Sequence, residues 1–274
     1  MNLPPAIMIV AWDQAASTHP PKADRQMGEQ PGGQSARGGL QGEPGGASES
    51  MYLDLHSHSV SSDDSRATVE QYLKWIQVLR KRGYALDGIV LTEHRKFDFD
   101  KDYSALAKQY GVVVLKGSEL DTRSGHFLVY GVTEGLAREI DFSNVRMDAR
   151  VLMQAARQHG AVAVPAHPGR FGIGLVDYID RGEVFPEVGI VELLNGGSRR
   201  GENERASVLC EKEGYLGIGG SDAHLTSHIG ACLTHFQTAI SNEGDLVEAL
   251  LSGRFRPVWL EESRNGAAPA RETQ

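Results

Sequence analysis

Short apolar runs with the composition of β-strands recur along the chain and are separated by stretches with helical periodicity. The runs are YLDLH (52–56), GIVLT (88–92), VVVLK (112–116), HFLVYG (126–131), AVAVPA (161–166), GIVELLN (189–195) and YLGIGG (215–220). Strands that alternate with helices are typical of parallel βαβ units. The pattern predicts an α/β fold built as a TIM-like barrel. The long, poorly helical connection after HFLVYG predicts that this barrel is distorted.

The first connection carries the clearest helical pattern. Its apolar face consists of Val69, Tyr72, Leu73, Ile76 and Leu79. Thr68 and Gln71 have the spacing of a capping box, and Gly83 stands where a glycine commonly follows a helix. A second helix is predicted from about residue 147 to 159, ending at Gly160.

Composition sets the expected boundaries of the fold. The chain has 274 residues, 40% of them hydrophobic, which is enough for a barrel-sized core. Residues 1–50 are rich in Gly, Pro, Gln and Ser and are predicted to be a disordered extension. The folded domain is predicted over 51–262, followed by a flexible tail over 263–274. Met51 as the natural start of the chain is an alternative interpretation of the extension.

Charge and hydropathy restrict the expected partners. No apolar run approaches the ~18 residues needed to span a bilayer, so no membrane partner is expected. Cys210 and Cys232 lack metal-type or redox-type spacing, which indicates buried thiols in a cytoplasmic protein. The net charge of −8 argues against a dedicated nucleic-acid binder. Nucleic acid is therefore expected only as a short nucleotide substrate.

Metal-binding residue types occur at the ends of the predicted strands. They are His56, His58, His94, Glu119, His126, His167, Asp222 and His224. The carboxyl ends of the strands carry the active site in α/β barrels. Residues two apart in a strand point the same way, so His56 and His58 are expected to face one cavity, as are Asp222 and His224. His126 precedes its run, which fits only if that strand is reversed or the ligand lies on a loop.

A single histidine at a strand end is more often a hydrogen-bonded core or loop residue than a metal ligand. Six of the ten histidines lie at such ends, however, with Asp and Glu beside them. This constellation indicates a metal centre. Mixed imidazole and carboxylate donors suit zinc, manganese or iron.

The order of these motifs resembles a known family. DLHSHSVSSDD (54–64), LTEH (91–94), GSEL (117–120), GHFLVYG (125–131), AHPGRFG (166–172) and GSDAH (220–224) are similar to the successive motifs of the PHP (polymerase and histidinol phosphatase) family. The resemblance covers roughly residues 52 to 260. It implies a distorted (βα)7 barrel, two or three divalent ions (Mn, Zn or Fe) and hydrolysis of phosphoesters. The chain shows no polymerase or helicase module and would be a stand-alone member.

The resemblance also implies which residues hold each ion. The first ion would be held by His56, His58, Glu119 and Asp222, the second by Glu119 as a bridge with His126 and His167, and the third by Asp63, His94 and His224. Asp63 is chosen over Asp64 because the family spacing HxHxxxxD reaches it. Two positions depart from the family pattern: Asp64 replaces a frequent glycine, and Glu93 replaces the usual aspartate.

Such a centre would suit phosphoryl chemistry. Three divalent ions against three carboxylates leave a charge of about +3, which favours a phosphate dianion and its transition state. A metal-activated hydroxide would be the nucleophile. The candidate catalytic residues are Glu119, Asp222, His224 and Arg170. Arg170 and Arg199 are also candidates for substrate binding through their guanidinium groups, with a solvated surface position as the alternative.

The predicted function is that of a metal-dependent phosphatase or phosphodiesterase acting on a small phosphorylated metabolite or nucleotide. An amidohydrolase-type metal hydrolase also uses an HxH pair on its first strand, but it leaves Asp63, Glu119 and His224 unexplained. A nuclease is a further alternative, weakened by the acidic net charge. A non-catalytic metal-binding regulatory module would be expected to have lost ligands.

Overall fold

The computed structural model describes residues 50–264, and the structural statements below concern these residues. The seven predicted runs form β1 (Met51–Ser57), β2 (Gly88–His94), β3 (Val113–Thr122), β4 (Gly125–Tyr130), β5 (Val162–Pro165), β6 (Ile190–Asn195) and β7 (Leu216–Gly220). Two strands that the sequence patterns did not predict follow, β8 (Cys232–Phe236) and β9 (Phe255–Trp259). The predicted arms over 1–50 and 263–274 lie outside the described residues, apart from Ser50, Ser263 and Arg264, and remain predictions.

Both predicted helices are present. The seven helices are α1 (Val69–Lys81), α2 (Ser104–Tyr110), α3 (Glu134–Glu139), α4 (Ala149–Gln158), α5 (Leu175–Ile179), α6 (Glu202–Glu213) and α7 (Glu243–Ser252), with short 3₁₀ turns at Thr226–His228 and Leu260–Ser263. The capping box of α1 is confirmed, because Thr68 Oγ1 accepts from Gln71 N and Gln71 Oε1 accepts from Thr68 N. Gly83 follows α1 with a φ of +89°.

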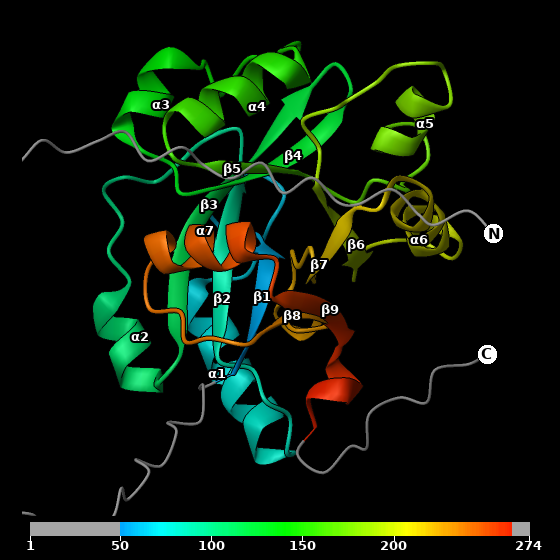
Figure 1. Cartoon of the computed structure of the whole chain (residues 1–274). Coiled ribbons are helices and arrows are strands. Elements are labelled where there is room, and N and C mark those ends of the chain that lie inside the picture. Colours follow the sequence, from blue (N-terminus) through cyan, green and yellow to red (C-terminus); the bar gives the residue numbers. More distant parts are fainter. Residues whose placement is uncertain (1–49, 265–274) are drawn as a thin grey trace, which may run out of the picture. The chain divides into compact units, whose positions relative to one another are not determined.

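The strands form a mixed sheet rather than the predicted ring of parallel strands. The main sheet has the order β5-β4-β3-β2-β1-β8-β9, and it curls into a half-barrel (Figure 1). Only β1, β2 and β3 run parallel to one another within it. The α/β class is confirmed, whereas a full (βα)7 barrel is not. Residues 123 and 124 alone join β3 to β4, which is too short for a crossover helix, so β4 returns antiparallel.

Strands β6 and β7 form a separate parallel pair that lies between the two edges of the main sheet. β6 contacts β5, and β7 contacts β1, β8 and β9. The chain just after β7 bonds to the end of β1, since Asp222 N donates to His56 O (2.7 Å) and His58 N donates to Ala223 O (2.9 Å). These two bonds bring the GSDAH motif against the HxH motif.

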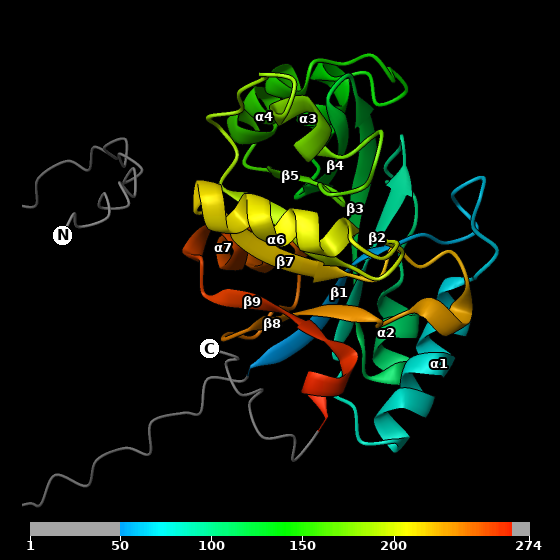
Figure 2. The ribbon, with the colours of Figure 1, turned by 90° about the vertical axis from the view of Figure 1, so that its right-hand side faces the viewer.

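Helices cover the outer faces of the sheets. α1 packs with β2 and the β8–β9 pair, α4 packs on β4 and β5, and α7 contributes to the core around β1 and β3. Figure 2 shows α6 lying along the β6–β7 pair. Cys210 and Cys232 are buried free thiols, as predicted. Among residues 50–264, no helix has the length and apolarity that a membrane crossing requires.

Candidate metal centre

The predicted ligands gather at one end of the curled sheet. Strand ends or the residues just after them supply most of the side chains: His56 and His58 from β1, His94 from β2, Glu119 from β3, His167 after β5, and Asp222 and His224 after β7. His126 begins β4, which is antiparallel to β3, so its front position reaches the same end as the carboxyl ends of its neighbours. The reversed-strand alternative for His126 is therefore the correct one.

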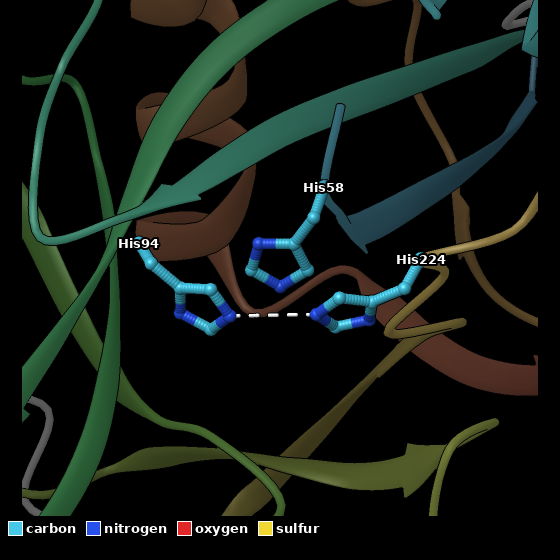
Figure 3. A group of neighbouring side chains, drawn as sticks. All are labelled: His58, His94 and His224. Carbon is cyan, nitrogen blue, oxygen red and sulfur yellow. Dashed lines mark hydrogen bonds between the residues drawn. The ribbon is translucent and has the colours of Figure 1, made fainter. Parts of the chain in front are cut away.

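Three groups of side chains bring potential ligand atoms within 4.8 Å of one another. The groups are His56, His58, Glu119 and Asp222; Glu119, His126 and His167; and His58, His94 and His224. Figure 3 shows the three imidazoles of the last group turned toward one another. The first two groups have the same members as the sets that the motif order implied. The third contains His58 where Asp63 was expected.

Glu119 stands between the groups and presents a different oxygen to each side. Its Oε1 lies 3.0 Å from both His126 Nδ1 and His167 Nε2. Its Oε2 lies 3.1 Å from His56 Nε2 and 3.2 Å from His58 Nε2. The side chain is 1% exposed, so its charge is shielded from bulk water. This is the geometry of a carboxylate that could bridge two cations.

Asp64, and not Asp63, lies beside the third group. Asp64 Oδ2 is 3.2 Å from both His94 Nε2 and His224 Nε2. The Asp63 side chain is 78% exposed and faces Arg95 at 3.5 Å. The choice of Asp63 is thus corrected to Asp64. The loop is fixed by a tertiary contact that spacing does not report: Glu93 accepts hydrogen bonds from residues 59 and 62.

The electrostatics of the site depend on the pairing of buried acids with imidazoles. Burial alone would raise the pKa of the Glu119 and Asp222 carboxyls, but the facing imidazoles, His56 first, hold both pKa values well below the usual range. Burial alone would lower the pKa of His56, but Glu192, Asp222 and Glu119 together raise it well above its ordinary value. Without a cation, therefore, the facing carboxylates favour a proton on His56.

The donor set fits divalent cations. His56 Nε2 lies 3.0 Å from His58 Nε2, and His94 Nε2 lies 3.4 Å from His224 Nε2. A pair of ring nitrogens this close can share one proton between them, whereas a bound cation accepts both lone pairs. Mixed nitrogen and carboxylate donors match zinc, manganese and iron.

Two of the clustered residues have a strained backbone. His167 and Asp222 adopt positive φ values, +30° and +52°, and such strain concentrates at functional sites.

A set of buried polar residues supports the ligands from behind. Glu192, in β6, contacts His56 Nδ1 at 3.0 Å through Oε1. Asp54, which the sequence analysis missed, is fully buried and accepts from the backbone N–H groups of Ser221 and Gly230, both at 2.8 Å. Burial raises the pKa of Asp54 to about 6. The signal in both cases is an acid inside an otherwise apolar strand.

The two predicted substrate-binding arginines have different positions. Arg170 Nη2 donates to Asp222 Oδ2 at 2.7 Å and to Asn195 Oδ1 at 3.1 Å, so it borders the ligand groups. Arg199 is exposed, its backbone N–H donates to Glu202, and its side chain borders a separate hollow of about 370 Å³ with Trp259. Among the described residues, no contact joins Arg199 to the ligand groups.

A third arginine at the mouth was missed by the sequence analysis. Arg95 directly follows His94, adopts a φ of +54° and is 39% exposed. Its guanidinium lies 3.3 Å from Asp121 and 3.5 Å from Asp63.

A larger hollow of about 1030 Å³ lies at the amino ends of the strands, near Tyr103 and α7. It contains none of the clustered ligands.

Comparison with known proteins finds a family model that matches part of the chain and solved structures with a similar fold. Residues 200–255 match a family model described as PHP-associated. PsfC from Pseudomonas syringae PB-5123 is 21% identical, with a TM-score of 0.56 over 78% of this chain and 93% of that chain. A Bacteroides vulgatus ATCC 8482 two-domain protein that contains a predicted PHP-like metal-dependent phosphoesterase is 21% identical, with a TM-score of 0.52 over 84% and 70% of the two chains.

A DNA-acting enzyme shares the fold as well. The lesion-specific endonuclease PfuEndoQ from Pyrococcus furiosus is 14% identical, with a TM-score of 0.53 over 76% of this chain and 57% of that chain. The likeness weakens the prediction, based on net charge, that longer nucleic acid is not a substrate. A search of the curated proteins found no match.

Proposed function

We propose that the chain is a PHP-domain protein, as the match of residues 200–255 and the shared fold support, and that it is a metal-dependent phosphoesterase of small phosphorylated molecules, either metabolites or nucleotides. The observation that carries this proposal is the Glu119 carboxylate, whose two oxygens face two separate sets of imidazoles. A carboxylate whose only role was to end a strand would not need imidazoles on both of its oxygens. An isolated buried acid would instead neutralise itself.

The proposed ligand assignment follows the three groups. His56, His58 and Asp222 would hold one cation and His126 and His167 a second, with Glu119 between them. His94 and His224, with Asp64 beside them, would hold a third. When bound, divalent cations would acidify water and offset the charge that develops on a phosphoryl group. Glu119, Asp222 and His224 would then act on the reacting phosphoryl group through the cations that they hold.

Arg170 is the residue best placed to bind the substrate's phosphoryl oxygens. Its guanidinium borders the ligand groups through Asp222 and is about a quarter exposed, so one face is open to a ligand. A planar guanidinium can donate two parallel hydrogen bonds to a phosphate. Asn195 Oδ1 accepts from the same Nη2 group at 3.1 Å and limits its motion. Arg199 is not assigned a role, because its contacts lie elsewhere.

The alternative functions differ in what they require of these residues. An amidohydrolase-type hydrolase leaves the second oxygen of Glu119 and the His94–His224 pair without a role. A nuclease is the second candidate, because the fold is shared with an endonuclease. A net charge of −8 disfavours long polyanions, since it lowers their local concentration.

The test is a hydrolysis screen of the purified protein with measured ion content, read by phosphate release for the monoesters and by product chromatography for the other substrates. Sugar phosphates, nucleotides, bisphosphates and histidinol phosphate form one arm, a short DNA duplex the second, and N-acyl amides the third. The proposal predicts metal-dependent turnover in the first arm that Glu119→Gln abolishes. Turnover confined to the amide or duplex arm would overturn it. So would a fully ion-loaded protein that hydrolyses none of the phosphate esters.

A further inference from the structure

Glu192 is a fully buried acid at the centre of β6, and both of its oxygens are engaged. Oε1 lies 3.0 Å from His56 Nδ1. Oε2 accepts from the backbone N–H of His167 at 2.7 Å and from Asn195 Nδ2 at 3.0 Å. One side chain thus contacts a proposed ligand of the first cation and the backbone of a proposed ligand of the second.

The contact with His56 decides which ring nitrogen is available to a cation. A carboxylate only accepts hydrogen bonds, so the nitrogen that faces it, Nδ1, must carry a proton. The lone pair of the neutral ring is then on Nε2. That nitrogen points at the first group, 3.0 Å from His58 Nε2 and 3.1 Å from Glu119 Oε2. Carboxylates behind metal-binding histidines generally act in this way.

The contact with His167 fixes a strained backbone. His167 adopts a φ of +30°, which is uncommon for a residue with a side chain. Its N–H donates to Glu192 Oε2, and its Nε2 faces Glu119 Oε1 at 3.0 Å. The hydrogen bond to Glu192 therefore helps to hold the His167 ring against the bridging carboxylate.

We propose that Glu192 is a positioning residue that sets the tautomer of His56 and the backbone of His167, and so couples the first two cation sites. This inference rests on the proposed function only in treating the clustered residues as cation ligands. Substrate identity does not enter it.

The proposal predicts an unusual order of mutational effects. In Glu192→Gln, the two N–H donors at Oε2 would select the amide oxygen, which leaves the amide NH₂ facing His56 Nδ1. Nδ1 must then accept, the ring proton moves to Nε2, and the lone pair toward the first group is lost. Glu192→Ala removes the partner but lets the ring choose either tautomer. The near-isosteric change should therefore be the more harmful one, opposite to the order for a packing role.

The experiment measures cation binding without any substrate. Zinc content and affinity, from mass spectrometry and chelator competition, are compared for wild type, Glu192→Gln and Glu192→Ala. The control is Glu202→Gln, because Glu202 is buried and accepts from the backbone N–H groups of Phe171 and Arg199, away from the cation groups. We expect one cation to bind about 10–100-fold more weakly in Glu192→Gln, a smaller loss in Glu192→Ala, and no change in the control.

A second readout applies if Glu192→Ala fails to fold. Nitrogen-15 spectra of the histidine side chains, with His56 assigned through His56→Asn, report the tautomer directly. Wild type with zinc should show a protonated Nδ1 and a zinc-shifted Nε2, and Glu192→Gln should lose both features. Wild-type zinc affinity and an unchanged His56 spectrum in Glu192→Gln would overturn the inference. A protein that shows the predicted binding pattern but hydrolyses no phosphoester would refute the proposed function alone.

Discussion

Glu119 and the paired histidines are the residues for which local sequence was most informative. The HxH spacing of His56 and His58 places both rings on one side of β1, and both Nε2 atoms reach Glu119 Oε2. That convergence was predictable from a period of two along a strand. The position of Asp64 was not, because the loop after His58 is held by Glu93 from another strand. Spacing along the chain carries no record of such a contact.

Glu119→Gln should be the most damaging conservative substitution in the site. An amide keeps the shape but removes the charge that would hold two cations together, so turnover should fall by more than the ~10–100-fold typical of a residue that only supports a ligand. Glu93→Gln is the comparison. Glu93 contacts the serines of the loop that carries Asp64 and does not contact the first two cation groups, so we expect a smaller loss than in Glu119→Gln. Turnover and ion stoichiometry are measured for both, on one substrate. Full ion content with near-native turnover in Glu119→Gln would show that no bridge exists.

Asp64→Asn and Asp63→Asn form a neighbouring pair that tests the corrected assignment. Asp64 lies 3.2 Å from two imidazoles, whereas Asp63 faces Arg95 in solvent. An exposed ion pair contributes little, so Asp63→Asn should leave ion content and turnover near the wild-type values. Asp64→Asn should weaken the third cation and reduce turnover. A larger effect at Asp63 than at Asp64 would reverse the correction.

At the scale of elements, the apolar runs predicted the existence of β1 to β7 but not all of their directions. The two-residue turn between β3 and β4 leaves no room for a helix, which explains why β4 is antiparallel. The sequence did not reveal this turn, because the predicted run ended at residue 116 whereas β3 continues to Thr122. β9 was missed because FRPVW contains an arginine and a proline, residues that weaken a strand pattern. β8 was missed although CLTHF is as long as several of the predicted runs. β8 pairs with β1 and β9 pairs with β8, and both pairings join segments that are far apart in the sequence.

Thr234 links β8 to β7 where no ladder joins them. Its Oγ1 accepts from Gly219 N at 2.8 Å and donates to Gly219 O at 3.0 Å. The two backbones approach so closely that a Cβ on Gly219 would lie 2.3 Å from Leu233 O. Thr234→Val keeps the shape but leaves both backbone groups buried and unpaired, at a cost of about 1–3 kcal/mol. Thermal unfolding should show a Tm lower by roughly 2–10 °C.

The control for this substitution is Thr226→Val, at a half-buried residue of the otherwise exposed turn Thr226–His228. Thr226 lies outside the strands, and the Tm of Thr226→Val should stay within about 2 °C of wild type, as for most surface changes. A stable Thr234→Val variant would indicate that β7 is held in place by its contacts with β1 and β9 alone.

For the whole molecule, the sequence predicted the class of the fold and the end at which the site lies. Closure of the sheet was not predictable, because it is decided by which distant strands pair. A pair such as β6–β7 can fill the gap without extending the ladder. The site forms despite this difference, since its residues need only lie at the same end of the curled sheet. Antiparallel β4 and the chain after β7 reach that end as well as parallel strands do.

The affinity for cations should rise with pH through the neutral range. The pKa values of His56, His58 and His126 are raised in the ion-free protein, with burial opposing and nearby carboxylates outweighing it. These rings therefore carry protons at a pH where free histidine is largely neutral, and a cation must displace them. Calorimetry in buffers of different ionisation enthalpy should detect proton release on binding. An affinity independent of pH between 6 and 8, roughly either side of the ordinary histidine pKa, would contradict this sign.

The central claim is that cations held by these side chains enable phosphoester hydrolysis, and a cation titration of the stripped protein tests it most directly. Phosphate release, ion content and Tm are followed together as manganese or zinc is added. We predict no release without ions, release that grows with occupancy, and a Tm that rises because ligand binding stabilises the folded state, by about 2.7 kcal/mol at a free concentration of 100 times Kd. Turnover that survives exhaustive chelation, with ion content confirmed near zero, would contradict the account.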